Sequence, residues 1–301
     1  EVREAGARAG AMVVHTQGEV DDALDRCQNA GPRGAPPAAI RQLLKVAREA
    51  KVRLPAAVAR FGSQILSQSP GSLKPDELWL VHEQVAVACL DSGDLDAAKG
   101  LILKLDARFP DSNRVHTLKG MYLEAVGQWD KADEVYASVL EESEANQPAW
   151  KRRAAAARAR GDVGKAERVL NEYLAVFSAD AEAWEELASL HTQAGRLKQA
   201  AFCYEELILA APQNPRFHLR YADLTYAQGG VARFRTALAY YALALDLCGG
   251  ASKHALFGIS ACGAHLQAAK GQMKITDEES VLVANAKKSL SQLYRLGAPA
   301  L

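Results

Sequence analysis

Glycine recurs at a fixed interval through the middle of this 301-residue chain. Gly93, Gly127, Gly161, Gly195 and Gly229 are each separated from the next by 34 residues. A period of roughly 20 to 50 residues is typical of architectures in which each period forms one supersecondary unit and the units stack. The spacing therefore indicates a stack of similar units rather than a single globular core.

A second series of small residues follows five positions after the glycines, at Ala98, Ala132, Ala166 and Ala200. Glycine most easily adopts the left-handed conformation that ends a helix, and alanine lets two helix axes approach closely. Each unit is therefore predicted to contain a helix, a turn at the glycine and a second helix. The seam between the two helices is expected to be filled one helical turn after each alanine, by Ile102, Tyr136, Leu170 and Tyr204.

Counting back from the glycines places the starts of five units near Trp79, Asn113, Gln147, Ala181 and Pro215. The fifth unit is irregular, because about three extra residues follow Gly229 and Gly230 before the pattern resumes. The period and its residues resemble the tetratricopeptide repeat, most clearly at Trp184, Leu187, Ala188, Gly195, Ala200, Tyr204 and Pro212. The predicted fold is an all-α tetratricopeptide-repeat solenoid of about five helix pairs, with extra capping helices at both ends.

Three regions follow from this pattern. The repeats are assigned to 76–250, an N-terminal helical and capping region to 1–75, and C-terminal capping helices to 251–301. In the N-terminal region we expect one helix over 20–29, and over 38–67 either one helix broken at Pro55 or a diverged pair that caps the first repeat. In the C-terminal region we expect helices over 252–270 and 276–296, because the ends of a solenoid must cover an apolar face.

The charge balance excludes some partners. The chain holds 36 Lys and Arg against 36 Asp and Glu, so it lacks the basic field of a typical nucleic-acid-binding protein. Its five cysteines are scattered and suit a reducing compartment rather than a disulfide framework. No apolar stretch approaches the roughly 20 residues of a membrane-spanning helix.

The sequence carries none of the common catalytic or phosphate-binding motifs. His82, His116 and His218 fall at the fourth position of their units, where Trp150 and Trp184 stand in the others, so packing in the seam is the favoured interpretation. We therefore predict no catalytic residue, no cofactor and no metal site.

Charge is concentrated where the first helices of a solenoid line its groove. Lys151, Arg152 and Arg158 form a basic block in the third unit, Glu182, Glu185 and Glu186 an acidic block in the fourth, and Arg216 and Arg220 a second basic block in the fifth. Two interpretations stay open: neighbouring helices pair these charges, or the blocks bind a partner, with the first basic block docking an acidic peptide.

Some tetratricopeptide proteins grip the acidic C-terminal tails of cytosolic chaperones through a carboxylate clamp. Lys151, Arg216 and Arg220 match that pattern, but Ala155 and Glu186 stand where the clamp has asparagines. Glu186 would repel a carboxylate, so the clamp is not expected.

Several strings contain residues that the generic repeat does not require. They are LWLVHEQVAVACLDSGDLDAA, RFPDSNRVHTLKGMYLEA, LNEYL, DAEAWEELASLH, AAFCYEELILAAPQNP, YADLTYAQGG and ALFGIS, in this order between 78 and 260. Together they resemble the family of subunit 2 of the endoplasmic reticulum membrane protein complex, over roughly 76–262. Residues 1–75 match this family poorly, and the similarity fades after Gly263.

This resemblance implies a peripheral, non-catalytic scaffold on the cytoplasmic face of the endoplasmic reticulum membrane. Its implied partners are the cytosolic segments of integral subunits and a soluble subunit, in a hetero-oligomer that inserts transmembrane segments, including tail anchors. The alternative is a free-standing cytosolic adaptor or co-chaperone that binds acidic peptide tails.

Overall fold

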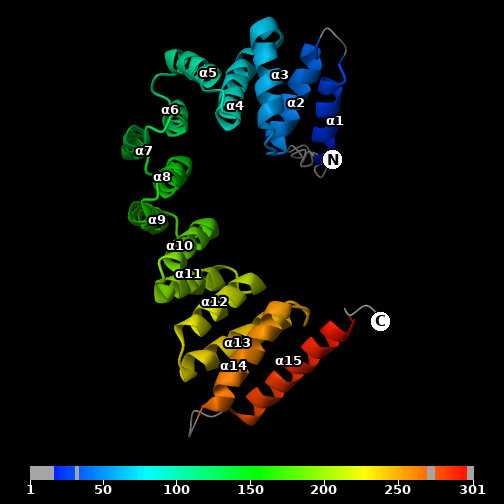
Figure 1. Cartoon of the computed structure of the whole chain (residues 1–301). Coiled ribbons are helices and arrows are strands. Elements are labelled where there is room, and N and C mark those ends of the chain that lie inside the picture. The colour runs from blue at the N-terminus through cyan, green and yellow to red at the C-terminus, as the bar shows by residue number, and fades with distance from the viewer. Residues whose placement is uncertain (1–16, 31–33, 270–274, 297–301) are drawn as a thin grey trace, which may run out of the picture. The chain divides into compact units, whose positions relative to one another are not determined.

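The computed structural model describes residues 17–30, 34–269 and 275–296. Within those residues the chain forms the helices α1 to α15 and one short 3-10 helix (Figure 1). The prediction of an all-α repeat fold is confirmed. The parts of the predicted terminal regions at 1–16, 31–33, 270–274 and 297–301 lie outside the described residues.

The chain divides into two compact units, 1–160 and 161–301. The first contains α1 (Gln17–Gln28), α2 (Pro37–Glu49), α3 (Pro55–Gln68), the short 3-10 helix η1 (Pro70–Ser72), α4 (Pro75–Ser92), α5 (Leu95–Arg108), α6 (Asn113–Ala125), α7 (Trp129–Glu142) and α8 (Gln147–Ala159). The second contains α9 (Val163–Val176), α10 (Ala181–Gln193), α11 (Leu197–Ala210), α12 (Pro215–Gln228), α13 (Val231–Leu247), α14 (Lys253–Ala268) and α15 (Asp277–Leu296). Within each unit, successive helices pack against one another.

The repeat starts agree with the glycine period at α6, α8, α10 and α12. The first start is wrong by four residues, because α4 begins at Pro75 rather than Trp79. Proline is well suited to the first turn of a helix, where its missing N–H removes no hydrogen bond. In the N-terminal region Pro55 likewise opens a new helix, so α2 and α3 are two helices, and α3 packs directly against α4.

The turn glycines have positive φ at every period: Gly93 79°, Gly127 76°, Gly161 83°, Gly195 70° and Gly229 72°. The fifth turn differs, since ψ is 169° at Gly229 and φ is 95° at Gly230. Two successive residues with positive φ are tolerated almost only where both are glycine. The Gly229–Gly230 pair therefore accounts for the irregular spacing of the fifth unit.

The alanines of the second series are fully buried, at 1% exposure or less for Ala98, Ala132, Ala166 and Ala200. Of the seam residues, Ile102, Tyr136 and Leu170 are buried and Tyr204 is half-buried. Trp150 is buried and Trp184 half-buried.

A glycine beneath a buried tyrosine occurs in both units. A Cβ atom added to Gly120 of α6 would lie 2.4 Å from the ring of Tyr136, and one added to Gly258 of α14 would lie 2.5 Å from the ring of Tyr241. The Tyr136 hydroxyl donates to Glu124, and the Tyr241 hydroxyl donates to Asp223 (2.7 Å). Each glycine therefore lets the tyrosine ring pack directly against the helix backbone, and the hydroxyl of that ring forms a hydrogen bond with a carboxylate.

Candidate partner-binding surfaces

The first basic block lies on α8. Lys151 and Arg158 are exposed and Arg152 is half-buried. Arg152 lies 3.7 Å from the carboxylate of Glu124 on α6. This carboxylate is largely buried, with 14% of its side chain exposed. Burial raises the pKa of Glu124, and the Tyr136 hydrogen bond and the charge of Arg152 oppose that rise. Part of the basic block therefore balances a half-buried carboxylate of the same chain.

Arg153 of α8 and Arg160, the residue directly after this helix, hold the helix to α7. Arg153 donates to Asp133 (2.8 Å), and Arg160 donates to Asp130. These pairs leave Lys151 and Arg158 as the most exposed cations of the predicted block.

The acidic block and the second basic block belong to the second unit. Glu182 is exposed, Glu185 and Glu186 are half-buried, and Arg216 and Arg220 are exposed. Arg216 lies 3.9 Å from Glu185 on the neighbouring first helix, whereas Arg220 pairs with Asp223 on its own helix at 3.8 Å. Pairing between neighbouring helices is thus present at Arg216. Long, exposed pairs contribute about 0–1 kcal/mol, so these two pairs add little to the stability of the fold.

Arg220 also lines a pocket of mixed polarity between α10, α11 and α12, which we call the Arg220 pocket. Its volume is about 420 Å³, and its lining is Ser189, Thr192, Gln193, Leu197, Tyr204, Arg220, Asp223, Leu224 and Ala227. Asp223 accepts hydrogen bonds from Tyr241 (2.7 Å) and His254 (2.7 Å). Burial raises the pKa of Tyr204, and the charge of Arg220 opposes this rise. The pocket is therefore suited to polar or charged groups.

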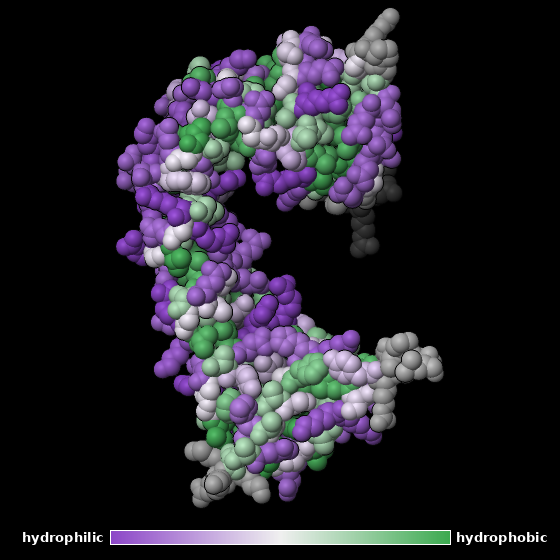
Figure 2. All heavy atoms as spheres, viewed as in Figure 1, coloured by the Kyte–Doolittle hydropathy of each residue, from purple (hydrophilic) through white to green (hydrophobic). Residues whose placement is uncertain are grey.

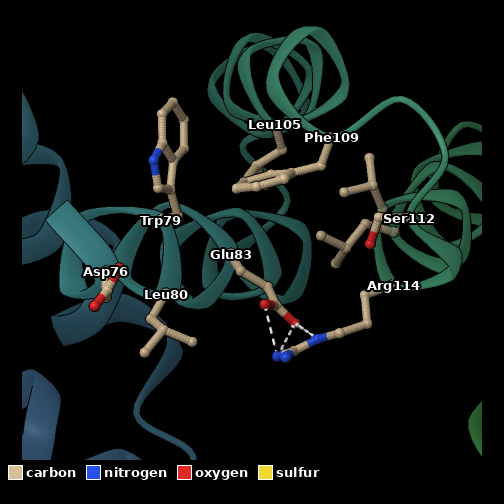
Figure 3. A pocket seen from close by; sticks show the side chains of 10 residues that line it. Asp76, Trp79, Leu80, Glu83, Leu105, Phe109, Ser112 and Arg114 are labelled. Carbon is tan, nitrogen blue, oxygen red and sulfur yellow. Dashed lines mark hydrogen bonds and ion pairs between the residues drawn. The ribbon is translucent and has the colours of Figure 1, made fainter.

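The first unit has an apolar pocket that sequence reasoning did not find, here called the Trp79 pocket. It lies between the first half of α4, the end of α5 and the start of α6, and measures about 380 Å³ (Figure 3). Trp79, Leu105, Phe109, Val115 and Leu118 form its apolar wall, and Asp76, Leu80, Glu83, Ser112 and Arg114 complete the lining. The rings of Trp79 and Phe109 meet edge to face at 5.6 Å. The repeat pattern could have indicated part of this lining. Counted from Trp79, Leu80 and Glu83 are the second and fifth residues of the first unit, and Arg114 is the second residue of the next unit, 31 residues after Glu83.

Ring nitrogens at the fourth position of three units bind the preceding turn. The indole N–H of Trp150 donates to the carbonyl of Glu144 (2.9 Å), and that of Trp184 donates to Ser178 (2.9 Å). His218 Nε2 lies 2.7 Å from the carbonyl of Pro212. In each case the carbonyl is six residues earlier. His218 therefore has a structural role. Its position in the sequence predicted packing in the seam, and the structure adds the contact with a backbone carbonyl.

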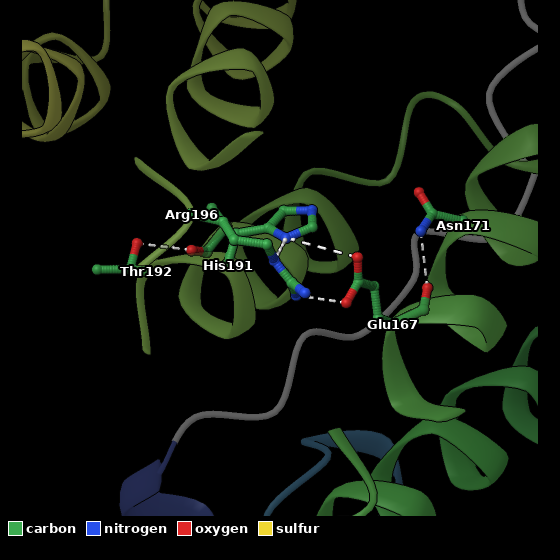
Figure 4. A network of polar contacts seen from close by, with 6 residues as sticks. Glu167, Asn171, His191, Thr192 and Arg196 are labelled. Atoms are coloured by element: carbon green, nitrogen blue, oxygen red, sulfur yellow. Dashed lines mark hydrogen bonds and ion pairs between the residues drawn. The ribbon is translucent and has the colours of Figure 1, made fainter. Parts of the chain in front are cut away.

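His191 lies in a polar network between α9, α10 and the turn before α11 (Figure 4). Arg196 Nε donates to His191 Nδ1 (3.2 Å), Arg196 also donates to Glu167, and His191 Nδ1 is 3.6 Å from Glu167. Burial is the main cause that lowers the pKa of His191, and Glu167 opposes it. This arrangement keeps a neutral imidazole inside the seam and joins successive helices.

Reactive side chains are held in the core. Cys27, Cys89, Cys203 and Cys262 are buried, and burial raises the pKa of each thiol, to about 12 for Cys203 and Cys262. A thiol with a raised pKa is a poor nucleophile at neutral pH. In the part of the chain that the structure describes, no three His, Cys, Asp or Glu side chains are grouped as metal ligands.

The last two helices carry several exposed apolar side chains. Phe257, Val281, Leu293 and Tyr294 are each more than a third exposed, and Phe257 meets Tyr294 edge to face at 6.2 Å. On the visible face of the second unit, Figure 2 shows apolar patches in several places among polar residues. None of the described helices is both long enough and apolar enough to cross a membrane.

Comparison with known proteins identifies the family. A family model described as the EMC2 TPR-like repeat domain matches residues 101–238. The chain is 33% identical over 258 residues to "ER membrane protein complex subunit 2" of Xenopus tropicalis, covering 85% of this chain and 86% of that protein. It is 35% identical over 209 residues to the protein of the same name from Dictyostelium discoideum, covering 69% and 65% of the two chains. "TPR repeat protein oca3" of Schizosaccharomyces pombe is 35% identical over 207 residues, covering 68% and 73%.

Solved structures add less. PilF of Pseudomonas aeruginosa covers 73% of this chain and 93% of its own, at 19% identity and a TM-score of 0.45, which is too low to carry an argument. The family assignment therefore rests on the curated relatives. The 258-residue alignment is longer than the stretch 76–262, so the similarity extends into at least one of the two terminal regions of this chain. The chain belongs to the family of ER membrane protein complex subunit 2, with its tetratricopeptide-repeat fold.

Proposed function

We propose that this chain is a non-catalytic scaffold subunit of the endoplasmic reticulum membrane protein complex. It lies peripherally on the cytoplasmic face of the membrane and holds cytosolic segments of integral subunits together with a soluble partner subunit. In this way it supports the insertion of transmembrane segments, including those of tail-anchored proteins.

The observation that carries the proposal is the extent of the similarity. The alignment with the Xenopus tropicalis protein covers 85% of this chain and 86% of that protein, so it includes far more than a generic repeat. That protein is named as a subunit of a membrane complex. A subunit of this family is expected to present its surface to several other chains.

The chemistry of the surface is compatible with a binding role. Each unit offers a pocket between successive helices, one mainly apolar and one of mixed polarity. Interfaces combine a buried apolar centre with a polar rim, and the Trp79 pocket has both. The buried cysteines and the packed His191 and His218 favour a structural rather than a catalytic use of these residue types.

The rival function, an adaptor for acidic peptide tails, is disfavoured by local charge. Arg216 lies beside Glu185, and Arg220 lies beside Asp223. A carboxylate tail approaching either arginine would meet a carboxylate already there, which opposes binding. Ala155 and Glu186 replace the asparagines that a carboxylate clamp requires.

Affinity purification of the tagged full chain from detergent extracts tests the proposal. We expect membrane-spanning partners in fixed stoichiometry, and a fall in the abundance of this chain when those partners are removed. Recovery of the chain without any integral membrane protein, together with tight binding of free acidic C-terminal peptides, would favour the adaptor. Charge reversal at Lys151 and Arg152 tests the first basic block separately, since unchanged recovery of every partner would exclude it as a docking site.

A further inference from the structure

The Trp79 pocket has an apolar wall and two ends that differ in polarity. At one end Arg114 donates to both carboxylate oxygens of Glu83, at 2.8 and 2.7 Å, so this carboxylate is already neutralised (Figure 3). At the other end, on the first turn of α4, Asp76 is exposed. Leu80 adds an apolar contact beside the opening, with 39% of its surface exposed.

Two polar groups at the Asp76 end have no partner within the described residues. The indole N–H of Trp79 donates no hydrogen bond there, in contrast to Trp150 and Trp184, whose N–H groups bind the preceding turn. Asp76 forms no ion pair with any described residue. Figure 3 shows the nitrogen edge of the Trp79 indole facing the same end of α4 as Asp76. A hydrogen-bond donor and an anion, neither with a partner among the described residues, thus both belong to the lining of the apolar pocket.

We propose that the Trp79 pocket receives one large aliphatic or aromatic side chain from an extended segment of a partner protein, and that a Lys or Arg next to it pairs with Asp76. The Trp79 N–H donates to a backbone carbonyl of the same segment. This inference rests on the proposed function, since a scaffold must hold segments of other chains, and it specifies which kind of segment the first repeat selects.

Charge complementarity selects the occupant. With Glu83 neutralised by Arg114, the remaining charge at the rim is the negative charge of Asp76, which attracts a basic residue and repels an acidic one. The same charge opposes an anionic lipid surface. The apolar wall provides the central contact, and aromatic residues in such a position supply much of the binding energy of an interface.

A photo-crosslinking residue placed at Leu80 tests the proposal in the complete complex, isolated with the full chain. The matched control is the same residue at Leu103, a leucine of α5 in the same unit that is 58% exposed and outside the pocket. We expect the Leu80 probe to label a segment of another chain in which a large apolar residue stands next to Lys or Arg. Labelling only of acidic segments or of lipid from Leu80 would overturn the proposal.

Charge reversal sharpens the result. We expect Asp76→Lys to reduce the yield of crosslinking from Leu80 about fivefold, because an ion pair worth ~1 kcal/mol is lost. The matched control is Asp96→Lys, which alters an exposed acid on the first turn of α5 and should leave the yield unchanged. Replacing the labelled basic residue of the partner by Glu should restore the yield with Asp76→Lys. An Asp76→Lys variant that crosslinks as well as the original chain would contradict the pairing.

Asp76 also favours the start of α4 through the helix dipole, so a second variant separates binding from folding. Asp76→Asn removes the charge with little change in shape, and we expect an intermediate loss of crosslinking with an unchanged circular dichroism spectrum. Recovery of the integral partners without any labelling from Leu80 overturns this inference alone. Failure of the original chain to recover integral partners overturns the proposed function together with it.

Discussion

The Trp79 pocket and the Arg220 pocket are each formed by the two helices of one repeat and the first helix of the next, yet the Arg220 pocket is the more polar of the two. The Trp79 pocket lies at the start of its first helices and is mainly apolar. The Arg220 pocket lies toward the ends of α10 and α12 and is lined by polar and charged groups. The repeat therefore determines where a pocket can form, and the residues at non-repeating positions determine what it can bind.

The two units also differ in how they use the contact between tyrosine and carboxylate. In the first unit, Glu124 is only 14% exposed at its side chain and lies away from the Trp79 pocket. In the second unit, Asp223 is 29% exposed and lines the Arg220 pocket. The same packing device is structural in one unit and part of the candidate binding surface in the other.

The largest expected effect comes from breaking the packing that both units share. Gly120→Ala and Gly258→Ala each force a methyl group against a buried tyrosine ring, which is expected to cost about 1–3 kcal/mol of the free energy of unfolding. Urea denaturation, with hydrogen exchange to localise the change, measures it. The control is Gly100→Ala on α5, where no atom lies within 4 Å and alanine should stabilise by up to about 1 kcal/mol. Equal stability of all three variants would contradict the close contact.

A smaller effect separates the two units. Tyr136→Phe leaves Glu124 with Arg152 as its remaining neighbour, and losing one hydrogen bond to a buried carboxylate that keeps this neighbour is expected to cost about 1–2 kcal/mol. Tyr241→Phe leaves Asp223 with His254 and Arg220, so we expect a cost of about 1 kcal/mol or less. Urea unfolding of the two variants compares them, and a larger loss for Tyr241→Phe would reverse the proposed difference.

The second unit should also respond to mild acid through His191. Its pKa is lowered in the folded protein, so as the pH falls through the ordinary value of 6.5 the unfolded chain binds a proton before the native one does. Stability is therefore expected to fall over that window, and His191→Gln should make the dependence shallower. Unfolding midpoints at pH 7.5 and 5.5 provide the test. An unchanged slope in the variant would show that other groups dominate.

The smallest effect concerns two arginines that occupy the same repeat position. Arg114 contacts Glu83 through several short hydrogen bonds, whereas Arg216 lies 3.9 Å from Glu185. Arg114→Ala is expected to cost about 0.5–1 kcal/mol and Arg216→Ala close to zero. Thermal unfolding at low and high salt distinguishes them, since only the first variant should reduce the salt dependence.

Much of the fold could be predicted because the repeat is local. The glycine period located α6, α8, α10 and α12, since a turn that needs positive φ leaves a mark on the sequence itself. The start of α4 could not be located in this way, because the helix extends beyond the usual length of its unit. The three-part division at 75 and 250 stays a prediction.

The candidate sites were less accessible to sequence reasoning. The charged blocks could be placed on the first helices, but the pairing of Arg152 with Glu124 depends on how α6 and α8 pack. The Trp79 pocket depends on the space left between side chains of three helices, which no single position reveals. Spacing predicts neighbours, whereas cavities depend on the shapes of side chains that meet across helices.

The ring N–H groups of Trp150 and Trp184 bind carbonyls that precede them in the chain, and His218 contacts one at the same spacing. During synthesis each of these carbonyls leaves the ribosome before the ring that contacts it. Every such contact can therefore close as soon as the first turn of the following helix has emerged, without waiting for distant sequence. The chain is suited to vectorial assembly, in which each completed repeat provides the surface on which the next one folds.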